Sequence, residues 1–222
     1  MGVKSWWTVL PEEPQHALPA AAGQAGLVSQ LRPLIRELSK PGDLVLDPFA
    51  GWGTTLVACS VEGRRGIGFE VNPERAEEAR QRLAGYPDQE MRCGDARKLP
   101  LEADSVDLVL CDLPYFGTGL DTDSADPGQM YALREYDVYL GALEEAFTRI
   151  ARVMRPGAHA VIAVQNRRID GAFVPLAWDA GRVLARHLTL GDERIHLYDR
   201  PVDGDDPMAS NRAHEYLLMA TK

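Results

Sequence analysis

Short apolar runs alternate along this chain with stretches whose apolar residues recur at helical spacing. The run Val106–Cys111 is apolar at almost every position, which is typical of a strand buried on both faces of a sheet. Between residues 24 and 38 the apolar positions follow a helical period, and Lys40-Pro41-Gly42 ends the pattern, so we expect a helix there. The whole pattern predicts strands over 44–46, 65–71, 91–93, 106–111, 160–164, 195–198 and 216–220, and helices over 24–38, 54–61, 136–154 and 173–187, with a further helix that starts near Pro73 and ends before Gly85.

Strand and helix alternate from one end of the chain to the other, which predicts an α/β fold with a doubly wound sheet. We expect seven strands, of which the last two close the sheet as an antiparallel pair. One domain over 1–222 accounts for the length, because neither an internal repeat nor a linker divides the sequence. Residues 1–40 would form an N-terminal arm and helix, with the arm over 1–21 irregular. The loop 117–130 lacks periodicity, and we expect it to serve the substrate.

The composition is that of an ordinary globular protein, with 26% charged and 45% apolar residues. The net charge of −9 argues against a surface coated for nucleic acid, although arginines such as Arg167-Arg168 could still form a local basic face. No apolar run reaches the roughly 18 residues of a membrane span, and the start of the chain lacks the core of a signal peptide. Cys59, Cys93 and Cys111 form no C-x-x-C pair and fit reduced thiols. These features predict a cytoplasmic protein without a membrane partner.

The segment Asp47–Thr55, DPFAGWGTT, joins a predicted strand to a predicted helix. Gly51 and Gly53 can take positive φ and bring the main chain close to a ligand, and the following helix points its unpaired N–H groups to the same place. Glu70 ends the next strand 23 residues after Asp47, and a glycine-rich turn followed by an acid at about this spacing grips a ribose-bearing cofactor. The turn lacks G-x-G-x-x-G, and the Asp47 carboxylate would repel a pyrophosphate but suits a cationic amino-acid end. The pattern therefore indicates S-adenosylmethionine.

A second motif, Asp112-Leu113-Pro114-Tyr115, directly follows the strand 106–111. With both motifs the chain resembles the DNA amino-methyltransferases, which methylate adenine N6 or cytosine N4. Their usual DPFAGSGTT stands here as DPFAGWGTT, their D-P-P-Y stands as DLPY, and the cofactor motif comes first, as in one of their permuted groups. The resemblance spans nearly the whole chain and implies a Rossmann-like, class I S-adenosylmethionine-dependent methyltransferase fold. It also implies cofactor contacts from Asp47, Pro48, Phe49, Ala50, Gly51, Gly53, Thr54, Thr55, Glu70, Asp95 and Ala96.

The same resemblance gives the DLPY motif a chemical role. An exocyclic amine is a poor nucleophile because its lone pair is delocalised into the ring of the base. The Asp112 carboxylate and the main-chain carbonyl of Leu113 would accept its two N–H bonds, so that the nitrogen can pyramidalise and attack a methyl group. Pro114 fixes the turn, and Tyr115 offers a flat face to a flipped base. Two positions depart from the family: Leu113 replaces a proline, and Trp52 replaces a serine.

We therefore expect an enzyme that methylates an exocyclic amine of a nucleic-acid base, and adenine N6 in DNA first, because the motif opens with Asp and not Ser. The alternatives are cytosine N4 in DNA, guanine N2 or adenine N6 in RNA, and an accessory subunit with this fold that needs a partner. DNA is the expected partner in preference to RNA, and a homodimer or a separate specificity subunit stays open. No H-E-x-x-H sequence indicates a metal, and His214-Glu215 near the end of the chain is expected to be a structural pair.

Overall fold

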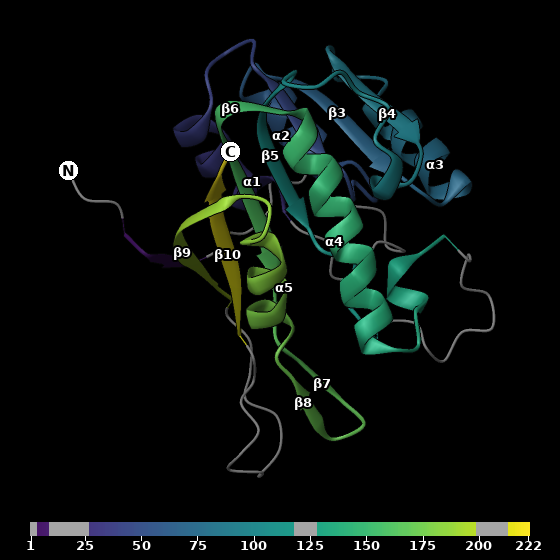
Figure 1. Ribbon diagram of the computed structural model, residues 1–222. Helices are drawn as coiled ribbons and strands as arrows, with labels where there is room; N and C mark the ends of the chain where they lie inside the picture. Colours follow the sequence, from purple (N-terminus) through teal and green to yellow (C-terminus); the bar gives the residue numbers. More distant parts are fainter. Residues whose placement is uncertain (1–3, 9–26, 118–127, 199–212) are drawn as a thin grey trace.

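The computed structural model describes residues 4–8, 27–117, 128–198 and 213–222 (Figure 1). Most of the arm 1–21 and of the loop 117–130 lies outside the described residues. Strands and helices follow one another as β1 (Trp6–Thr8), α1 (Val28–Leu38), β2 (Leu44–Asp47), α2 (Thr54–Val61), β3 (Arg65–Glu70), α3 (Pro73–Leu83), β4 (Gln89–Cys93), β5 (Val106–Asp112), α4 (Tyr136–Val153), β6 (Met154–Val164), β7 (Arg167–Ile169), β8 (Ala172–Val174), α5 (Leu176–Leu184), β9 (Thr189–Leu197) and β10 (His214–Thr221). Two short 3-10 helices cover Ala96–Lys98 and Met130–Ala132.

The central sheet has eight strands in the order β1-β9-β10-β6-β5-β2-β3-β4, so the expected number of seven is wrong by one. The additional strand is β1, which pairs in parallel with β9 in a stretch that we expected to be irregular. Three residues are too few to show an alternating pattern, so this strand could not be predicted from the sequence. The last two strands, β9 and β10, form the predicted antiparallel pair.

Helices cover both faces of the sheet, with α4 and α5 over one face and α1, α2 and α3 over the other (Figure 1). Successive residues of a strand point to opposite faces, so the strands supply two cores. On β2, Leu46 packs into the core beneath α4 and α5, and Val45 packs into the core beneath the other three helices. This burial on both faces explains why the central strands are apolar at nearly every position.

A small hairpin follows β6 and projects beyond the sheet (Figure 1). Strands β7 and β8 pair antiparallel, and Asp170 and Gly171 between them have φ of 49° and 79°. Positive φ at both turn residues is typical of the two-residue hairpin turn that Asp-Gly favours. The segment from Phe173 therefore begins as a strand, and α5 starts only at Leu176, so the expected helix start at 173 is wrong.

Strands β4 and β10 begin two residues earlier than expected, and two other strands begin six residues earlier. Strand β6 starts at Met154 instead of 160, and its first part runs through Pro156 and Gly157, which look like a turn in the sequence. Strand β9 starts at Thr189 instead of 195, and its first five residues are exposed to solvent. Exposed positions carry no apolar pattern, so these strand ends could not be read from hydrophobicity.

The fold brings three acidic residues to one edge of the sheet. Asp47, Glu70 and Asp112 are the last residues of the parallel strands β2, β3 and β5. From β2 the chain continues to β3 and β4 on one side of the sheet, and then crosses to β5 on the opposite side of β2. The strand order therefore reverses between β2 and β5. Ligands of open α/β sheets bind at this point, beyond the carboxyl ends of the strands.

No helix in the described ranges has both the length and the apolar character that a membrane crossing requires.

Candidate active site

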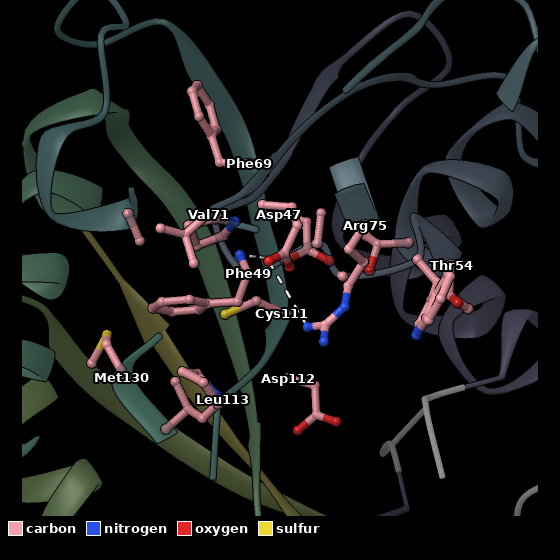
Figure 2. Close-up of a pocket in the computed structure, with 18 of the residues that line it drawn as sticks. Asp47, Phe49, Thr54, Phe69, Val71, Arg75, Cys111, Asp112, Leu113 and Met130 are labelled. Atoms are coloured by element: carbon pink, nitrogen blue, oxygen red, sulfur yellow. Dashed lines mark hydrogen bonds and ion pairs between the residues drawn. The ribbon is translucent and has the colours of Figure 1, made fainter. Parts of the chain in front are cut away.

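A pocket opens at the carboxyl ends of β2, β3 and β5. Figure 2 shows Phe49, Leu113 and Met130 along one side of it, Thr54 and Arg75 along the other, and the side chain of Asp112 between them. The pocket has about 1090 Å³ of empty space, part of it open solvent, which is enough for a cofactor-sized molecule.

The DPFAGWGTT loop is fixed to the neighbouring strand. The N–H of Ala50 donates a hydrogen bond to the carbonyl oxygen of Phe69 at 2.9 Å. Beside it, a Cβ on Gly68 would lie 2.7 Å from the Cβ of Ala50, so this close approach of loop and strand requires glycine on β3. Gly51 and Gly53 have φ of +50° and +77°, as the sequence predicted for the turn that leads into α2. The loop can therefore hold one shape without a ligand.

Asp47 lies in the floor of the pocket and is 4% exposed. The N–H of Phe49 donates to its Oδ1 at 3.0 Å, and Thr55 supplies a further hydrogen bond. Burial outweighs these bonds and raises the pKa of Asp47 to about 7, and the nearby negative charge of Glu70 acts in the same direction. Within the described part of the chain Asp47 forms no ion pair, so a cation bound in the pocket would have this carboxylate to itself.

The buried Asp47 makes the stability of the protein depend on pH. Its pKa is near 3.8 in the unfolded chain and about 7 in the folded protein. Between these values the folded state keeps a proton that the unfolded state has lost, so the free energy of unfolding falls as the pH rises through this window. We expect Asp47→Asn to be more stable than wild type at about pH 8, by on the order of 2 kcal/mol, and to lose that advantage near pH 4. Urea unfolding at both pH values measures the difference, and equal stabilities throughout would contradict a buried, unpaired carboxyl group.

Glu70 is held at the end of β3 through one of its two oxygens. Its Oε1 accepts hydrogen bonds from the N–H of Asn72 at 2.8 Å and from Nε2 of Gln129 at 3.1 Å. Arg75 on the first turn of α3 lies 3.8 Å from the same oxygen. The second oxygen, Oε2, accepts no hydrogen bond from the described residues. Glu70 is thus oriented by its surroundings and keeps an acceptor for a ligand.

Asp95 also lines the pocket but is engaged by a neighbouring residue. Arg97 donates to both carboxylate oxygens through its guanidinium group at 2.7 to 3.0 Å, and its main-chain N–H adds a bond of 2.9 Å to Oδ1. These bonds hold the pKa of Asp95 below its usual value, although its partial burial acts in the opposite direction. A ligand amine that approaches Asp95 would therefore compete with Arg97.

Asp112 ends β5, and no cation of the described residues forms an ion pair with it. The next residue, Leu113, is 2% exposed and donates its N–H to the carbonyl of Ala163 on β6 at 3.1 Å, which fixes the main chain at the motif. The Oδ1 atom of Asp112 is buried and has no hydrogen-bond partner among the residues that the structure describes. Burial, followed by the negative charge of Glu215, raises the pKa of Asp112 well above its usual range. A buried acceptor without a donor is costly, so this oxygen is poised for a donor from a ligand.

The structure gathers most of the residues that the sequence singled out. The residues that line the pocket are Asp47, Pro48, Phe49, Ala50, Gly51, Thr54, Thr55, Glu70, Asp95, Ala96, Asp112, Leu113 and Pro114. Gly53 does not line it, because it faces Leu83 of α3. Tyr115 does not line it either: its hydroxyl donates to Oε1 of Glu215 at 3.0 Å, and the guanidinium of Arg167 lies 5.5 Å from the centre of its ring.

Several lining residues were not anticipated. Glu215, which the sequence interpretation treated as part of a structural pair, faces the pocket together with Gln30 of α1. Arg75 and Gln129 join the site through Glu70, and Arg75 also lies 5.8 Å from the ring centre of Trp52. The position of Arg75 in the first helical turn after Glu70 was a signal that the sequence offered. Gln30 and Glu215 gave none, since 185 positions separate them.

The segment around DPFAGWGTT is similar in sequence to known methyltransferases. Residues 28–81 match the model of a family described as DNA methylase. The type II methyltransferase M.Cfr9I of Citrobacter freundii is 51% identical over 55 residues, which are 25% of this chain and 18% of that protein. A tRNA (guanine(10)-N2)-dimethyltransferase of Methanothermobacter thermautotrophicus is 33% identical over 99 residues, which are 44% of this chain and 28% of that protein. The chain thus covers less than a third of the length of either relative.

Among solved structures, a TehB-like SAM-dependent methyltransferase from Corynebacterium glutamicum is similar along almost the whole chain. The TM-score is 0.57 at 19% sequence identity, and the match covers 91% of each chain. The segment 28–81 contains DPFAGWGTT and Glu70, whereas DLPY lies beyond it. The chain therefore has the Rossmann-like fold of S-adenosylmethionine-dependent methyltransferases. The family match over residues 28–81 confirms the resemblance to the DNA amino-methyltransferases for that segment.

Proposed function

We propose that this protein is an S-adenosylmethionine-dependent methyltransferase that acts on the exocyclic amine of a nucleic-acid base, with adenine N6 in DNA as the first candidate. One observation carries the proposal. Asp112, the first residue of DLPY, lines the same pocket as the DPFAGWGTT loop, and its buried Oδ1 has no partner among the described residues. Two motifs that lie 65 positions apart in the chain thus meet at one cavity, as a methyl donor and an amine acceptor require.

The residues present fit this cofactor. Asp47 is a buried carboxyl that pairs with no cation of the described residues, and the cationic amino-acid end of S-adenosylmethionine would supply one. Glu70 keeps Oε2 for the ribose hydroxyl groups, and the backbone of Gly51 allows close approach. Asp95 and Ala96 would contact the adenine part, and Asp95 would exchange part of its bonding with Arg97 for the adenine amine. When bound, the cofactor supplies a methyl group that is activated by a positively charged sulfur.

The DLPY motif would prepare the amine. One N–H of the base would donate to Oδ1 of Asp112 and the other to the main-chain carbonyl of Leu113. Acceptors that are held in place before the reaction stabilise the positive charge that develops on the nitrogen. The hydrogen bond from Leu113 to Ala163 supplies this rigidity, which a proline provides in the usual motif.

The alternatives differ in the base and in the nucleic acid. Cytosine N4 presents a similar amine, and the similarity to a tRNA guanine-N2 dimethyltransferase supports an RNA base as the second candidate. An accessory subunit without activity of its own would not need an acceptor at position 112, and the intact Asp112 therefore favours an enzyme. A partner subunit for target recognition is compatible with all of these readings.

The hairpin of β7 and β8 offers a surface on which a nucleic-acid strand could lie. Phe173 and Trp178 are about half exposed, and their ring centres are 5.7 Å apart. On the other face of the hairpin, Ile169 packs against Gly117 at the end of the DLPY segment, so the aromatic pair is attached to the site. The hairpin projects from the sheet on the same side as the carboxyl end of β5 (Figure 1). Exposed aromatic side chains in such a place can stack on unpaired bases.

We expect Trp178→Ala to weaken the binding of single-stranded oligonucleotides by about 1 kcal/mol, or roughly fivefold, because one stacking contact is lost. Trp6→Ala is the matched control, since Trp6 is an equally exposed tryptophan on the edge strand β1. Fluorescence anisotropy with labelled oligonucleotides measures both affinities. Equal affinities of wild type and Trp178→Ala would remove the pair of Phe173 and Trp178 from the binding surface.

The proposed function is tested by methyl transfer from labelled S-adenosylmethionine to single- and double-stranded DNA and RNA, with digestion to nucleosides to identify the product. We expect N6-methyladenine in DNA. N4-methylcytosine or a methylated RNA base would select one of the alternatives. Absence of transfer to all four substrates, with normal cofactor binding, would point to a required partner subunit or to another acceptor.

A further inference from the structure

Glu215 on β10 lies in the wall of the pocket beside Asp112, and Tyr115 lies between them. The Tyr115 hydroxyl donates to Oε1 of Glu215 at 3.0 Å, and the same hydroxyl interacts with the carboxyl group of Asp112. Two acids of the site are thus connected through one hydroxyl group. The second acid lies outside both DPFAGWGTT and DLPY.

The other side of Glu215 is surrounded by hydrogen-bond donors. Its Oε2 accepts from Nε2 of Gln30 at 2.8 Å and from the hydroxyl of Tyr198 at 3.0 Å, and Nδ1 of His196 is 3.4 Å away. Glu215 is 4% exposed and His196 is fully buried, with its ring edge-on to Trp7 at 4.3 Å. Both carboxylate oxygens of Glu215 therefore accept hydrogen bonds, Oε2 from Gln30 and Tyr198 and Oε1 from Tyr115.

Asp112 has the opposite environment. Its Oδ1 has no partner in the described ranges, and burial and the charge of Glu215 both raise the pKa of Asp112. The other titratable groups that interact with the pair are Tyr115, Tyr139, Tyr198, Cys111, Asp47 and His196. No Lys or Arg forms an ion pair with either acid in the described part of the chain. Burial and the charge of Glu215 therefore both favour the protonated form of Asp112.

We propose that Glu215 is the final acceptor of the proton that the substrate amine loses, and that Asp112 and Tyr115 pass this proton to it. The proposal rests on the proposed function. As the nitrogen forms its bond to the methyl carbon, the carbon–sulfur bond breaks and its electron pair stays on sulfur, which leaves a proton to be removed from nitrogen. That proton moves to Oδ1 of Asp112, the acid proton of Asp112 moves to the oxygen of Tyr115, and the hydroxyl proton of Tyr115 moves to Oε1 of Glu215. The methylated amine is then neutral, Glu215 is protonated, and Asp112 and Tyr115 are again a neutral acid and a neutral hydroxyl.

This arrangement explains why a neutral Asp112 can serve the reaction. Its unpaired oxygen still accepts an N–H of the base, and the proton passes on to Glu215, which Gln30, Tyr198 and Tyr115 hold in place. In this scheme Glu215 receives the proton through Tyr115 and not directly from the amine.

The kinetic test compares Glu215→Gln, Tyr115→Phe and the double variant in single-turnover methyl transfer at saturating substrate. We expect each single variant to slow the transfer on the order of 10²-fold with little change in KM, as is typical when a proton acceptor is removed. The double variant should be no slower than either single one, because both interrupt the same path. Tyr198→Phe is the matched control: it removes the same kind of bond to Glu215 on the side away from Asp112, and it should slow the transfer far less than Tyr115→Phe. Additive losses, or equal losses for the two tyrosine variants, would overturn the proposal.

A second measurement needs no turnover. Infrared difference spectra of the cofactor-free protein should show the carbonyl stretch of a protonated buried carboxyl group that Asp112→Asn removes. In Glu215→Gln that band should disappear at a lower pH than in wild type, because the neighbouring negative charge is gone. An unchanged titration would show that the two acids are not coupled, whether or not the protein methylates nucleic acid. A normal shift together with absent methyl transfer would instead count against the proposed function.

Discussion

Replacement of Asp112 by alanine should abolish methyl transfer and leave cofactor binding intact. Asp112 has a buried Oδ1 without a donor, and the cofactor would be held by residues of β2, β3 and the segment after β4. Alanine removes both the acceptor for the amine and the group that takes its proton. Loss of a single preorganised interaction of this kind costs about 10²–10³ in rate, and we expect alanine to exceed that range.

The asparagine variant separates the two contributions. Asp112→Asn keeps an acceptor oxygen at nearly the same place but cannot take up or pass on a proton, so we expect a loss of about 10²–10³-fold, smaller than that of alanine. Calorimetry with S-adenosylmethionine should give the wild-type affinity for both variants. Transfer at the wild-type rate by Asp112→Ala would show that the amine is not activated by this motif. A loss of cofactor affinity equal to the loss of rate would move Asp112 from the amine site to the cofactor site.

Replacement of Glu70 by alanine should have the second-largest effect. It should weaken the binding of the cofactor and leave the turnover rate nearly unchanged. Glu70 is 6% exposed, and Oε1 is already bonded to Asn72 and Gln129, so Oε2 is the atom that we expect to meet the ribose hydroxyl groups. Charge-assisted hydrogen bonds contribute roughly 1.5–3 kcal/mol each, and the loss should be roughly 2–3 kcal/mol, or about 30- to 150-fold in Kd.

The ribose itself provides the control. A cofactor analogue without ribose hydroxyl groups should bind wild type and Glu70→Ala with similar affinity, because the contact is missing in both cases. If Glu70→Ala weakens the analogue as much as the cofactor, Glu70 acts by holding Asn72, Gln129 and Arg75 in place and not by contacting the ribose. Equal binding of S-adenosylmethionine to wild type and variant would remove Glu70 from the site.

The sequence predicted the features that depend on neighbouring residues. Strands β2, β3 and β5, the helices α2 and α4, and the meeting of Asp47, Glu70 and Asp112 at one edge all follow from local patterns and from the geometry of parallel strands. A glycine-rich turn between a strand and a helix is likewise a local feature, and its two positive φ values were foreseen.

Features that depend on distant or exposed residues could not be predicted in this way. Strand β1 exists because Ser5 and Trp6–Thr8 find the edge of β9, which lies some 190 positions further along the chain. The first half of β9 is exposed and carries no apolar signal. Asp170-Gly171 is a hairpin-turn signal that formed no part of the prediction, and the helix expected over 173–187 included the end of β8.

The electrostatics of the site were the least accessible part. The sequence does not show that the Arg97 guanidinium binds the Asp95 carboxylate. Residues two positions apart form this ion pair only because the 3-10 helix brings their side chains together. The proximity of Glu215 to Asp112 needs β10 inserted between β6 and β9, which is a property of the whole sheet. The raised pKa values of Asp47 and Asp112 follow from burial, which only the packed structure determines.

The edge-on packing of Trp7 against His196 gives the first strand a practical importance beyond its three residues. His196 lies 2.6 Å from Nε2 of Gln30, and Gln30 in turn holds Glu215. The beginning of the chain is therefore an unsuitable attachment point for an affinity tag or a label. A fusion partner that pulled this strand from β9 would disturb the pocket from behind while every motif residue remained in place, and a preparation weakened in this way could be mistaken for an inactive enzyme.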